Sequence, residues 1–106
     1  MQLHNAWIEV NLDALHHNIT SVKSHLAPGV KLLAVVKADA YGLGALACAK
    51  QFILSGADLL AVSTYAEAIQ LRKGGIEAPI LVFMPMLAKE ADAFWQARLL
   101  PSIDTE

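Results

Sequence analysis

Cysteine, aromatic residues and charge are all scarce in this chain. Of its 106 residues one is a cysteine, 7% are aromatic and 17% are charged. Cys48 cannot form a disulfide within the chain, and because it lies in an apolar helical pattern we expect it to be a buried packing residue. A lone buried thiol fits the reducing cytosol, so we expect a cytoplasmic protein. The net charge of −2, with no block of like charges, indicates no nucleic-acid partner.

Targeting and membrane-spanning segments are missing as well. The N-terminus lacks the basic region and the apolar core of a signal peptide. No run approaches the ~18 consecutive apolar residues that cross a membrane. The chain shows no linker, low-complexity tract or clear sequence repeat. We therefore expect one small domain without a membrane or a nucleic acid as its partner.

What the chain has in abundance is aliphatic side chains. Hydrophobic residues make up 56% of the sequence, and most are alanine, leucine, valine and isoleucine. Disordered chains show the opposite balance of hydrophobicity and charge, so this chain is expected to fold. Its continuous apolar runs predict strands that are covered on both faces.

The hydrophobic pattern alternates between short apolar runs and stretches with the three- and four-residue spacing of a helix. We predict strands at 6–10, 30–36, 59–62, 79–83 and 99–103, and helices at 12–26, 45–54, 64–74 and 87–97. This alternation predicts an α/β fold with a parallel sheet, flanking helices and right-handed crossovers, preceded by a short strand and an amphipathic helix.

Several residues carry signals for helix boundaries. Asn11 or Asp13 is suited to cap the first helix, and Gly56 to end the second. Thr64 and Glu67 have the spacing of a capping box at the start of the third. Three or four βα units are too few for an eight-stranded barrel, which needs roughly 250 residues, so we interpret the chain as the front portion of something longer.

One short stretch is suited to chemistry. The apolar run 32–36 ends at Lys37, at the carboxyl end of a predicted buried strand. α/β barrels place their catalytic residues at this end of their strands. Apolar surroundings disfavour the ammonium form of a lysine and make its amine a better nucleophile, as a lysine that forms a Schiff base requires.

Tyr41 and two glycines, Gly42 and Gly44, lie between Lys37 and the next predicted helix. Glycines at a helix start allow the backbone to approach an anion closely, and a tyrosine hydroxyl can donate to the same anion. A lysine that can react with an aldehyde lies beside groups that can bind a phosphate. This combination indicates pyridoxal 5'-phosphate as the cofactor. The alternative is that Lys37 is a strand-end lysine whose stem reaches along apolar surface to water.

The other polar and aromatic candidates are interpreted as structural. Asp39 is expected to serve its loop, and Arg72 and Lys73 to interact with a helix dipole. The four histidines do not share one helical face, so we expect surface or packing roles and no metal site for His4, His16, His17 and His25. Apolar packing is expected for Trp7, Trp95, Met84 and Met86, although the two methionines could also line a pocket.

The sequence resembles the alanine racemase family, the fold-type III pyridoxal-phosphate enzymes. The resemblance rests on residues 7–15, on His17–Asn18 and above all on residues 31–44, which contain the run VVKADAYGLG. It continues at residues 56–58, 66–68, 71–72, 75–76 and 79–82 and so covers essentially the whole chain.

The resemblance implies a fold and an activity. Residues 1–106 are expected to form the first three to four βα units of a (β/α)8 TIM-type barrel that binds pyridoxal 5'-phosphate, without the C-terminal β-domain of the family. Lys37 is implied to bind the cofactor covalently and to act as one of two proton-transfer bases, and Tyr41 to contribute to phosphate binding. The reaction implied is the interconversion of L-alanine and D-alanine for peptidoglycan synthesis.

The same resemblance implies a homodimer in the full-length form, because the second base of the family is a tyrosine that reaches across the dimer interface from the β-domain. The isolated chain is therefore expected to be inactive as a racemase. The N-terminal strand around Trp7 is implied to pair with that β-domain. Many family members have a histidine where this chain has Leu43, so a polar role is lost at that position.

Three alternative interpretations remain open. One is a non-catalytic pyridoxal-phosphate-binding or regulatory barrel protein. A second is a fragment of a fold-type III amino-acid decarboxylase, which also places a lysine at the end of its first barrel strand. A third is a catalytically inactive segment that completes its barrel with another polypeptide and exposes a sheet edge.

Overall fold

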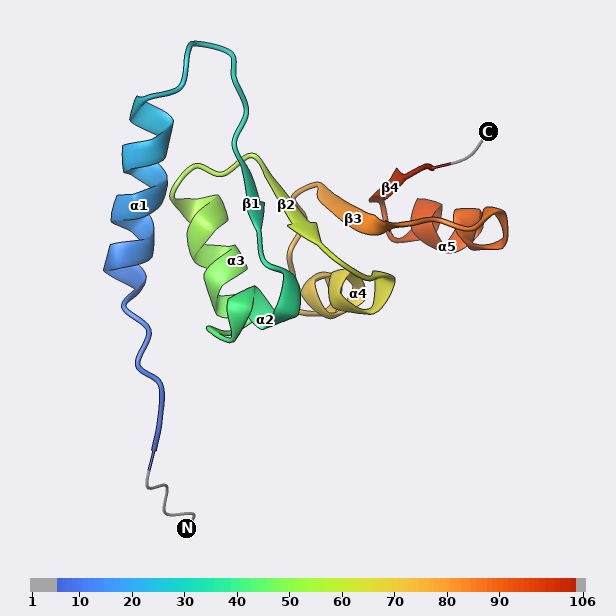
Figure 1. Cartoon of the computed structure of the whole chain (residues 1–106), viewed down its shortest axis with the longest axis horizontal. Helices are drawn as coiled ribbons and strands as arrows, with labels where there is room; N and C mark the ends of the chain where they lie inside the picture. Colours follow the sequence, from blue (N-terminus) through green and yellow to red (C-terminus); the bar gives the residue numbers. More distant parts are fainter. Residues whose placement is uncertain (1–5, 105–106) are drawn as a thin grey trace.

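The chain folds into a parallel sheet with helices packed against it (Figure 1). The computed structural model describes residues 6–104. In chain order the elements are α1 (Leu12–Ser24), β1 (Leu33–Val35), α2 (Lys37–Tyr41), α3 (Ala45–Leu54), β2 (Leu59–Val62), α4 (Tyr65–Lys73), β3 (Ile80–Pro85), the 3-10 helix η1 (Ala88–Glu90), α5 (Ala91–Gln96) and β4 (Leu99–Ser102). The α/β order expected from the sequence is confirmed.

The four strands lie side by side in chain order, and each neighbouring pair is parallel. Ala34 lies opposite Leu60, Leu60 opposite Ile80, and Ile80 opposite Leu99. These four residues form one row across the sheet. Pro101, which has no N–H to donate, lies in β4 at the edge of the sheet, where a strand tolerates proline.

The core lies between the helices and one face of the sheet. Alternate residues of a strand point to the same face, and the core residues of the strands lie at the alternate positions that begin with Ala34 in β1. They pack against buried residues of the helices and loops. Ala61 of β2, on the opposite face, is buried as well. The core residues from the sheet are Ala34, Val36, Leu60, Val62, Ile80, Val82 and Leu99, and those from the helices and loops include Cys48, Ala49, Ala68, Leu71 and Phe94.

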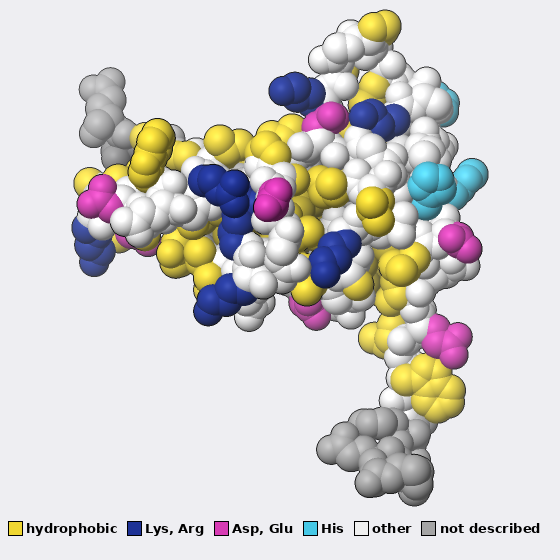
Figure 2. Space-filling view, turned by 180° about the vertical axis from the view of Figure 1, so that it is seen from behind, with side chains coloured by type: hydrophobic (Ala, Val, Ile, Leu, Met, Phe, Trp, Pro, Cys, Tyr) yellow, Lys and Arg dark blue, Asp and Glu magenta, His cyan; other side chains and the backbone are white. Residues whose placement is uncertain are grey.

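The opposite face of the sheet is open. Phe83 of β3 is 41% exposed and Leu100 of β4 is 42% exposed, and Leu33, Leu59 and Leu81 are half-buried. The expectation that the strands are covered on both faces is therefore wrong for this chain, because the described helices pack against one face only. Figure 2 shows hydrophobic side chains at the surface across the middle of the molecule, among scattered lysines and arginines.

The short strand expected at residues 6–10 does not form. The segment runs away from the sheet below α1 (Figure 1) and so has no strand edge with which its backbone can pair. Trp7 is 72% exposed and its indole N–H donates to Glu9 at 3.0 Å. Trp95 on α5 is 84% exposed. The prediction that both tryptophans are packing anchors is therefore wrong for the described chain.

The predicted helix boundaries are largely confirmed. The Asn11 side chain accepts hydrogen bonds from the backbone N–H groups of Asp13 and Ala14 and so caps α1. Thr64 and Glu67 form the expected capping box at α4. Gly56, at φ 113°, follows the C-terminus of α3, where a left-handed conformation favours glycine.

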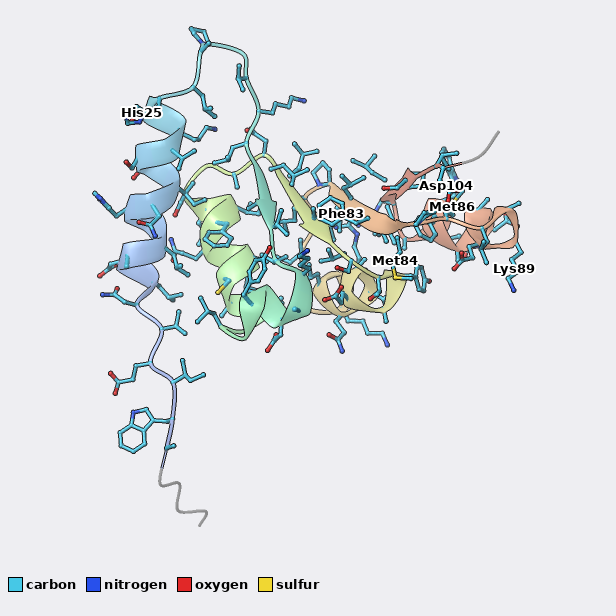
Figure 3. All side chains as sticks on the ribbon, in the orientation of Figure 1. His25, Phe83, Met84, Met86, Lys89 and Asp104 are labelled. Atoms are coloured by element: carbon cyan, nitrogen blue, oxygen red, sulfur yellow. The ribbon has the colours of Figure 1, made fainter. Side chains whose placement is uncertain are left out.

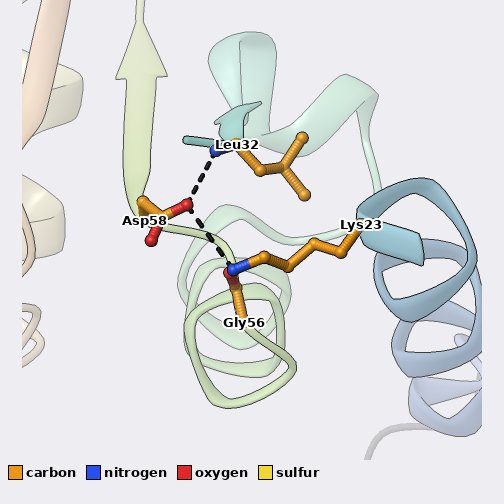
Figure 4. A network of polar contacts seen from close by, with 4 residues as sticks. All are labelled: Lys23, Leu32, Gly56 and Asp58. Carbon is orange, nitrogen blue, oxygen red and sulfur yellow. Dashed lines mark hydrogen bonds and ion pairs between the residues drawn. The ribbon is translucent and has the colours of Figure 1, made fainter. Parts of the chain in front are cut away.

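A polar network attaches α1 and β1 to the loop before β2 (Figure 4). Lys23 Nζ donates to the Gly56 carbonyl at 2.6 Å and lies 3.6 Å from an Asp58 carboxylate oxygen. That same oxygen accepts the backbone N–H of Leu32 at 2.7 Å. The Leu32 hydrogen bond is the main reason that the pKa of Asp58 lies below its ordinary value, and the Lys23 charge acts in the same direction against the effect of burial.

Candidate functional site

Lys37 lies at the carboxyl end of β1, as the sequence predicts. The backbone N–H of Val36 donates to the Ala61 carbonyl at 2.8 Å, so pairing with β2 continues up to the residue before Lys37. Lys37 itself is half-buried. Because the sheet is parallel, the carboxyl ends of β1 and β2 share one edge, and Figure 1 shows α2 and α4 as neighbours there.

The residues after Lys37 form a turn of left-handed helix, which the sequence pattern does not predict. Ala38, Asp39, Ala40 and Tyr41 have φ between 52° and 57°. Hydrogen bonds link Ala40 N–H to the Val36 carbonyl at 2.9 Å and Gly42 N–H to the Ala38 carbonyl at 3.0 Å. Left-handed backbone costs about 1–2 kcal/mol for each non-glycine residue, so the surrounding structure has to hold this turn.

Two carboxylates hold the left-handed turn. The Asp39 Oδ1 atom accepts the backbone N–H of Ala45, the first residue of α3, at 2.7 Å. A Glu67 oxygen, Oε2, accepts the backbone N–H of Ala38 at 2.8 Å. The expected structural role of Asp39 is thus confirmed, but the contact from Glu67 was not predicted, because only the fold brings residues 29 positions apart together.

Tyr41 ends the left-handed turn and is 64% exposed. Gly42 and Gly44 follow at φ 88° and 96°, values that favour glycine. The structure therefore places Lys37 and Tyr41 on one short element, α2. The N-terminus of α3, by contrast, already has an anion in place, because the Asp39 carboxylate occupies the Ala45 N–H.

This donor set fits a ligand that carries an aldehyde and a phosphate. The primary amine of Lys37 can condense with an aldehyde, and the exposed Tyr41 hydroxyl can donate to a phosphate oxygen. The carboxylate of Asp39 repels an anion at the start of α3. On this turn the Tyr41 hydroxyl is the donor that remains available to an anion.

A hollow lies between α4 and the end of β3. Thr64, Tyr65, Met84, Leu87 and Phe94 are among its lining residues. Figure 3 shows Met84 beside α4, and this side chain is 58% exposed. The sequence left open whether the methionines pack or line a pocket: Met84 lines this hollow, while the half-buried Met86 packs against the core.

Arg72 has a structural role in joining elements. Its guanidinium donates to the carbonyls of Ala97, Ile76, Ala78 and Arg98 at 2.8–2.9 Å. These contacts tie α4 to the loop before β3 and to the end of α5. The role is larger than the helix-dipole interaction expected from the sequence.

Two of the described histidines, His16 and His25, make polar contacts through their side chains. His16 Nδ1 lies 2.8 Å from the Ser55 hydroxyl at the end of α3, and His25 Nδ1 lies 2.8 Å from the Ser21 carbonyl. His4 lies outside the described residues. Between residues 6 and 104 no three histidine, cysteine, aspartate or glutamate side chains are grouped as metal ligands. No helix in that same range has the length and apolar character of a membrane span.

Comparison with known proteins identifies the family. Residues 10–106 match the family described as alanine racemase, N-terminal domain. Alanine racemase 2 of Oceanobacillus iheyensis is 55% identical over 78 residues, which are 74% of this chain and 20% of that protein. The alanine racemase of a Synechocystis species is 42% identical over 99 residues, which are 92% of this chain and 27% of that protein.

A solved structure gives the same result. The crystal structure of alanine racemase from Bacillus anthracis with bound L-Ala-P superposes with a TM-score of 0.88 and 36% identity over 93% of this chain and 26% of that one. The chain thus spans less than a third of the length of each of these proteins. With its sequence and its sheet both matching theirs, the chain belongs to the alanine racemase family.

Proposed function

We propose that residues 1–106 form part of the cofactor-binding barrel domain of an alanine racemase, which interconverts L-alanine and D-alanine with pyridoxal 5'-phosphate. Membership of the family supports the reaction class. The observation that carries the proposal is the position of Lys37, a half-buried amine at the carboxyl end of β1 on a turn that two carboxylates hold. In this proposal the enzyme acts in the cytoplasm and supplies D-alanine for peptidoglycan synthesis.

Lys37 and Tyr41 have separate roles in the proposal. The Lys37 nitrogen would hold the cofactor through its aldehyde carbon, with the aldehyde oxygen leaving as water, and the Tyr41 hydroxyl would donate a hydrogen bond to its phosphate. When bound, the cofactor supplies an electron sink that lowers the cost of removing the α-proton of alanine. The Lys37 amine would carry the proton on one face of the α-carbon.

Racemisation also needs a proton carrier on the opposite face of the α-carbon. Lys37 reaches one face only, so a second base has to come from a residue outside the turn. We propose that a second subunit of a homodimer supplies it in the complete enzyme. The 106-residue chain alone is therefore expected to bind the cofactor without racemising alanine.

Borohydride reduction after incubation with pyridoxal 5'-phosphate, followed by peptide mapping, tests the proposal. We expect one phosphopyridoxyl group, on Lys37, and its loss in Lys37→Ala. The exposed Lys31, Lys50, Lys73 and Lys89 are internal controls, because accessibility alone favours them over the half-buried Lys37. Labelling scattered over all lysines, or absent from Lys37, would overturn the assignment.

The predicted inactivity of the chain needs a separate assay. Purified chain is incubated with L-alanine and pyridoxal 5'-phosphate, and D-alanine is measured by chiral chromatography. No D-alanine above the level formed by free cofactor is expected. Racemisation that is lost in Lys37→Ala would show that the 106 residues contain both bases.

A further inference from the structure

We propose that Glu67 is a positioning residue for Lys37, because its carboxylate joins the left-handed turn after Lys37 to the start of α4. The proposal rests on the proposed function of Lys37 and assigns to Glu67 a role beyond the capping of its own helix. Glu67 touches neither substrate nor cofactor in this proposal. It acts through the backbone of Ala38, the residue that follows Lys37.

The two oxygens of Glu67 serve two different segments. Oε1 accepts the backbone N–H groups of Ser63 and Thr64 at 2.9 and 3.0 Å. Oε2 accepts the backbone N–H of Ala38 at 2.8 Å. One carboxylate therefore joins the end of β2 to the turn that follows β1.

The Ala38 contact acts on a strained part of the backbone. Ala38 is the first residue of the left-handed turn, at φ 52° and ψ 48°. If the Ala38 N–H group has no acceptor, the turn loses a constraint at the residue next to Lys37. The lysine side chain then samples a wider range of directions. A hydrogen bond to a carboxylate is stronger than one to a neutral oxygen, which suits this task.

A carboxylate is the side chain that both contacts require. Both carboxylate oxygens of Glu67 lie next to backbone N–H groups, so each oxygen has to accept a hydrogen bond. Glutamine has one accepting oxygen and one NH₂ group, so its NH₂ group would lie against one of these backbone N–H groups, and two donors would face each other. Aspartate keeps the charge but is one methylene shorter and cannot reach both segments from the same position.

Thr64 offers a matched control, because it belongs to the same capping box but not to the contact with Ala38. The Thr64 hydroxyl accepts the backbone N–H of Glu67 at 3.2 Å. Thr64→Ala removes this bond and the 3.4 Å contact from the Thr64 hydroxyl to Glu67 Oε1, but it leaves the contact between Glu67 Oε2 and Ala38. A purely structural role of Glu67 predicts the same behaviour for Glu67→Gln and Thr64→Ala.

Hydrogen exchange of the Ala38 amide, measured by NMR without cofactor, is the first test. We expect Glu67→Gln to speed exchange at Ala38 by about tenfold or more, the size of effect that losing a hydrogen bond to a charged group produces. Thr64→Ala should change it much less. Equal exchange at Ala38 in the wild type and in Glu67→Gln would overturn the proposal.

The rate of phosphopyridoxyl labelling at Lys37 is the second test. We expect Glu67→Gln to slow it by about tenfold at equal thermal stability, while Thr64→Ala stays close to the wild type. Should Glu67→Gln fail to fold, Glu67→Asp replaces it and is expected to show the same slowing. If the wild type is labelled at Lys37 and the variants react equally fast, the role of Glu67 is wrong. If the wild type is not labelled there, the proposed function itself fails.

Discussion

Ala38 is an exposed alanine that the fold holds at φ 52°. Glycine adopts this conformation without a steric penalty, and replacing an exposed methyl removes no buried surface. We therefore predict that Ala38→Gly raises the free energy of unfolding by about 0.5–1 kcal/mol, after the larger entropy of glycine in the unfolded chain is subtracted. Urea denaturation followed by circular dichroism measures the change.

Ala47 provides the matched control for Ala38. It is also exposed but lies within the right-handed helix α3. Ala47→Gly should lower the free energy of unfolding by about 1 kcal/mol. If both substitutions change stability in the same direction, the left-handed turn does not form in solution.

Asp58 makes stability depend on pH. Its pKa is lowered in the folded chain, first by the hydrogen bond from Leu32 and then by Lys23. A lowered folded-state pKa means that the stabilisation is complete above the unfolded-state pKa of about 4 and is lost as the pH falls through the lower folded-state value. We predict that Asp58→Asn lowers stability at pH 7 and that its difference from the wild type shrinks below about pH 4.

The control for this pH dependence is Asp104→Asn. Asp104 is exposed and follows β4. Its replacement should leave the thermal stability at pH 7 close to that of the wild type. Parallel profiles of Asp58→Asn and the wild type down to pH 2 would contradict the role assigned to Asp58.

The residue types in the sequence predicted the contacts between residues a few positions apart in the chain. Asn11, Gly56 and the pair Thr64 and Glu67 were assigned correctly because capping depends on local spacing. The contact from Glu67 to Ala38 spans 29 positions and needed the fold. The left-handed turn also could not be predicted, because alanine, aspartate and tyrosine carry no local preference for four such residues in a row.

At the scale of elements, the side chain of Arg72 joins α4 to the neighbouring segments. Its guanidinium donates to four backbone carbonyls around the ends of α4 and α5. Arg72→Leu keeps part of the apolar stem but leaves these partly buried acceptors without their donor. We predict a loss of about 2–3 kcal/mol in the free energy of unfolding, measured by urea denaturation.

Lys73 is the neighbouring control for Arg72. It is exposed at the C-terminus of the same helix. Lys73→Leu should change stability by less than about 0.5 kcal/mol, as expected for a surface substitution. Comparable losses in both variants would mean that the effect comes from removing charge at the helix end and not from the carbonyl contacts.

The pattern of apolar residues predicted most elements correctly, with differences at their ends. The strand expected at 30–36 contains seven residues, whereas β1 is Leu33–Val35. The helix expected at 87–97 forms as η1 followed by α5. Periodicity reports which residues can be buried, but pairing also needs a neighbouring edge, which residues 6–10 lack in this structure.

For the whole molecule, the open face of the sheet determines how the chain behaves in solution. Phe83 and Leu100 are more than 40% exposed on that face. We predict that the isolated chain binds the dye ANS and self-associates, and that the double variant Phe83→Thr and Leu100→Thr reduces both. Fluorescence titration and analytical ultracentrifugation measure these properties.

Leu54 is the control for the open face. It is 81% exposed and is the last residue of α3, not part of a strand. Leu54→Thr should leave self-association nearly unchanged. A monomer that binds no dye in the wild type would show that the open face is covered in solution.

The position of the candidate site was predictable at this largest scale, because parallel α/β sheets place their functional residues at the carboxyl edge of the strands. Lys37 and Tyr41 could therefore be chosen from the sequence. The open face of the sheet could not be predicted, because a continuous apolar strand has the same sequence pattern whether one or both of its faces are covered.

The left-handed turn also has a stereochemical consequence. Its backbone is the mirror image of an ordinary helical turn, so an amino acid of D configuration fits it as an L residue fits α3. A chain assembled by chemical ligation with a D-alanyl residue at position 38 keeps the methyl group and the stiffness of alanine while removing the clash. Comparing that chain with Ala38→Gly separates the steric strain of the turn from the entropy of glycine in the unfolded state.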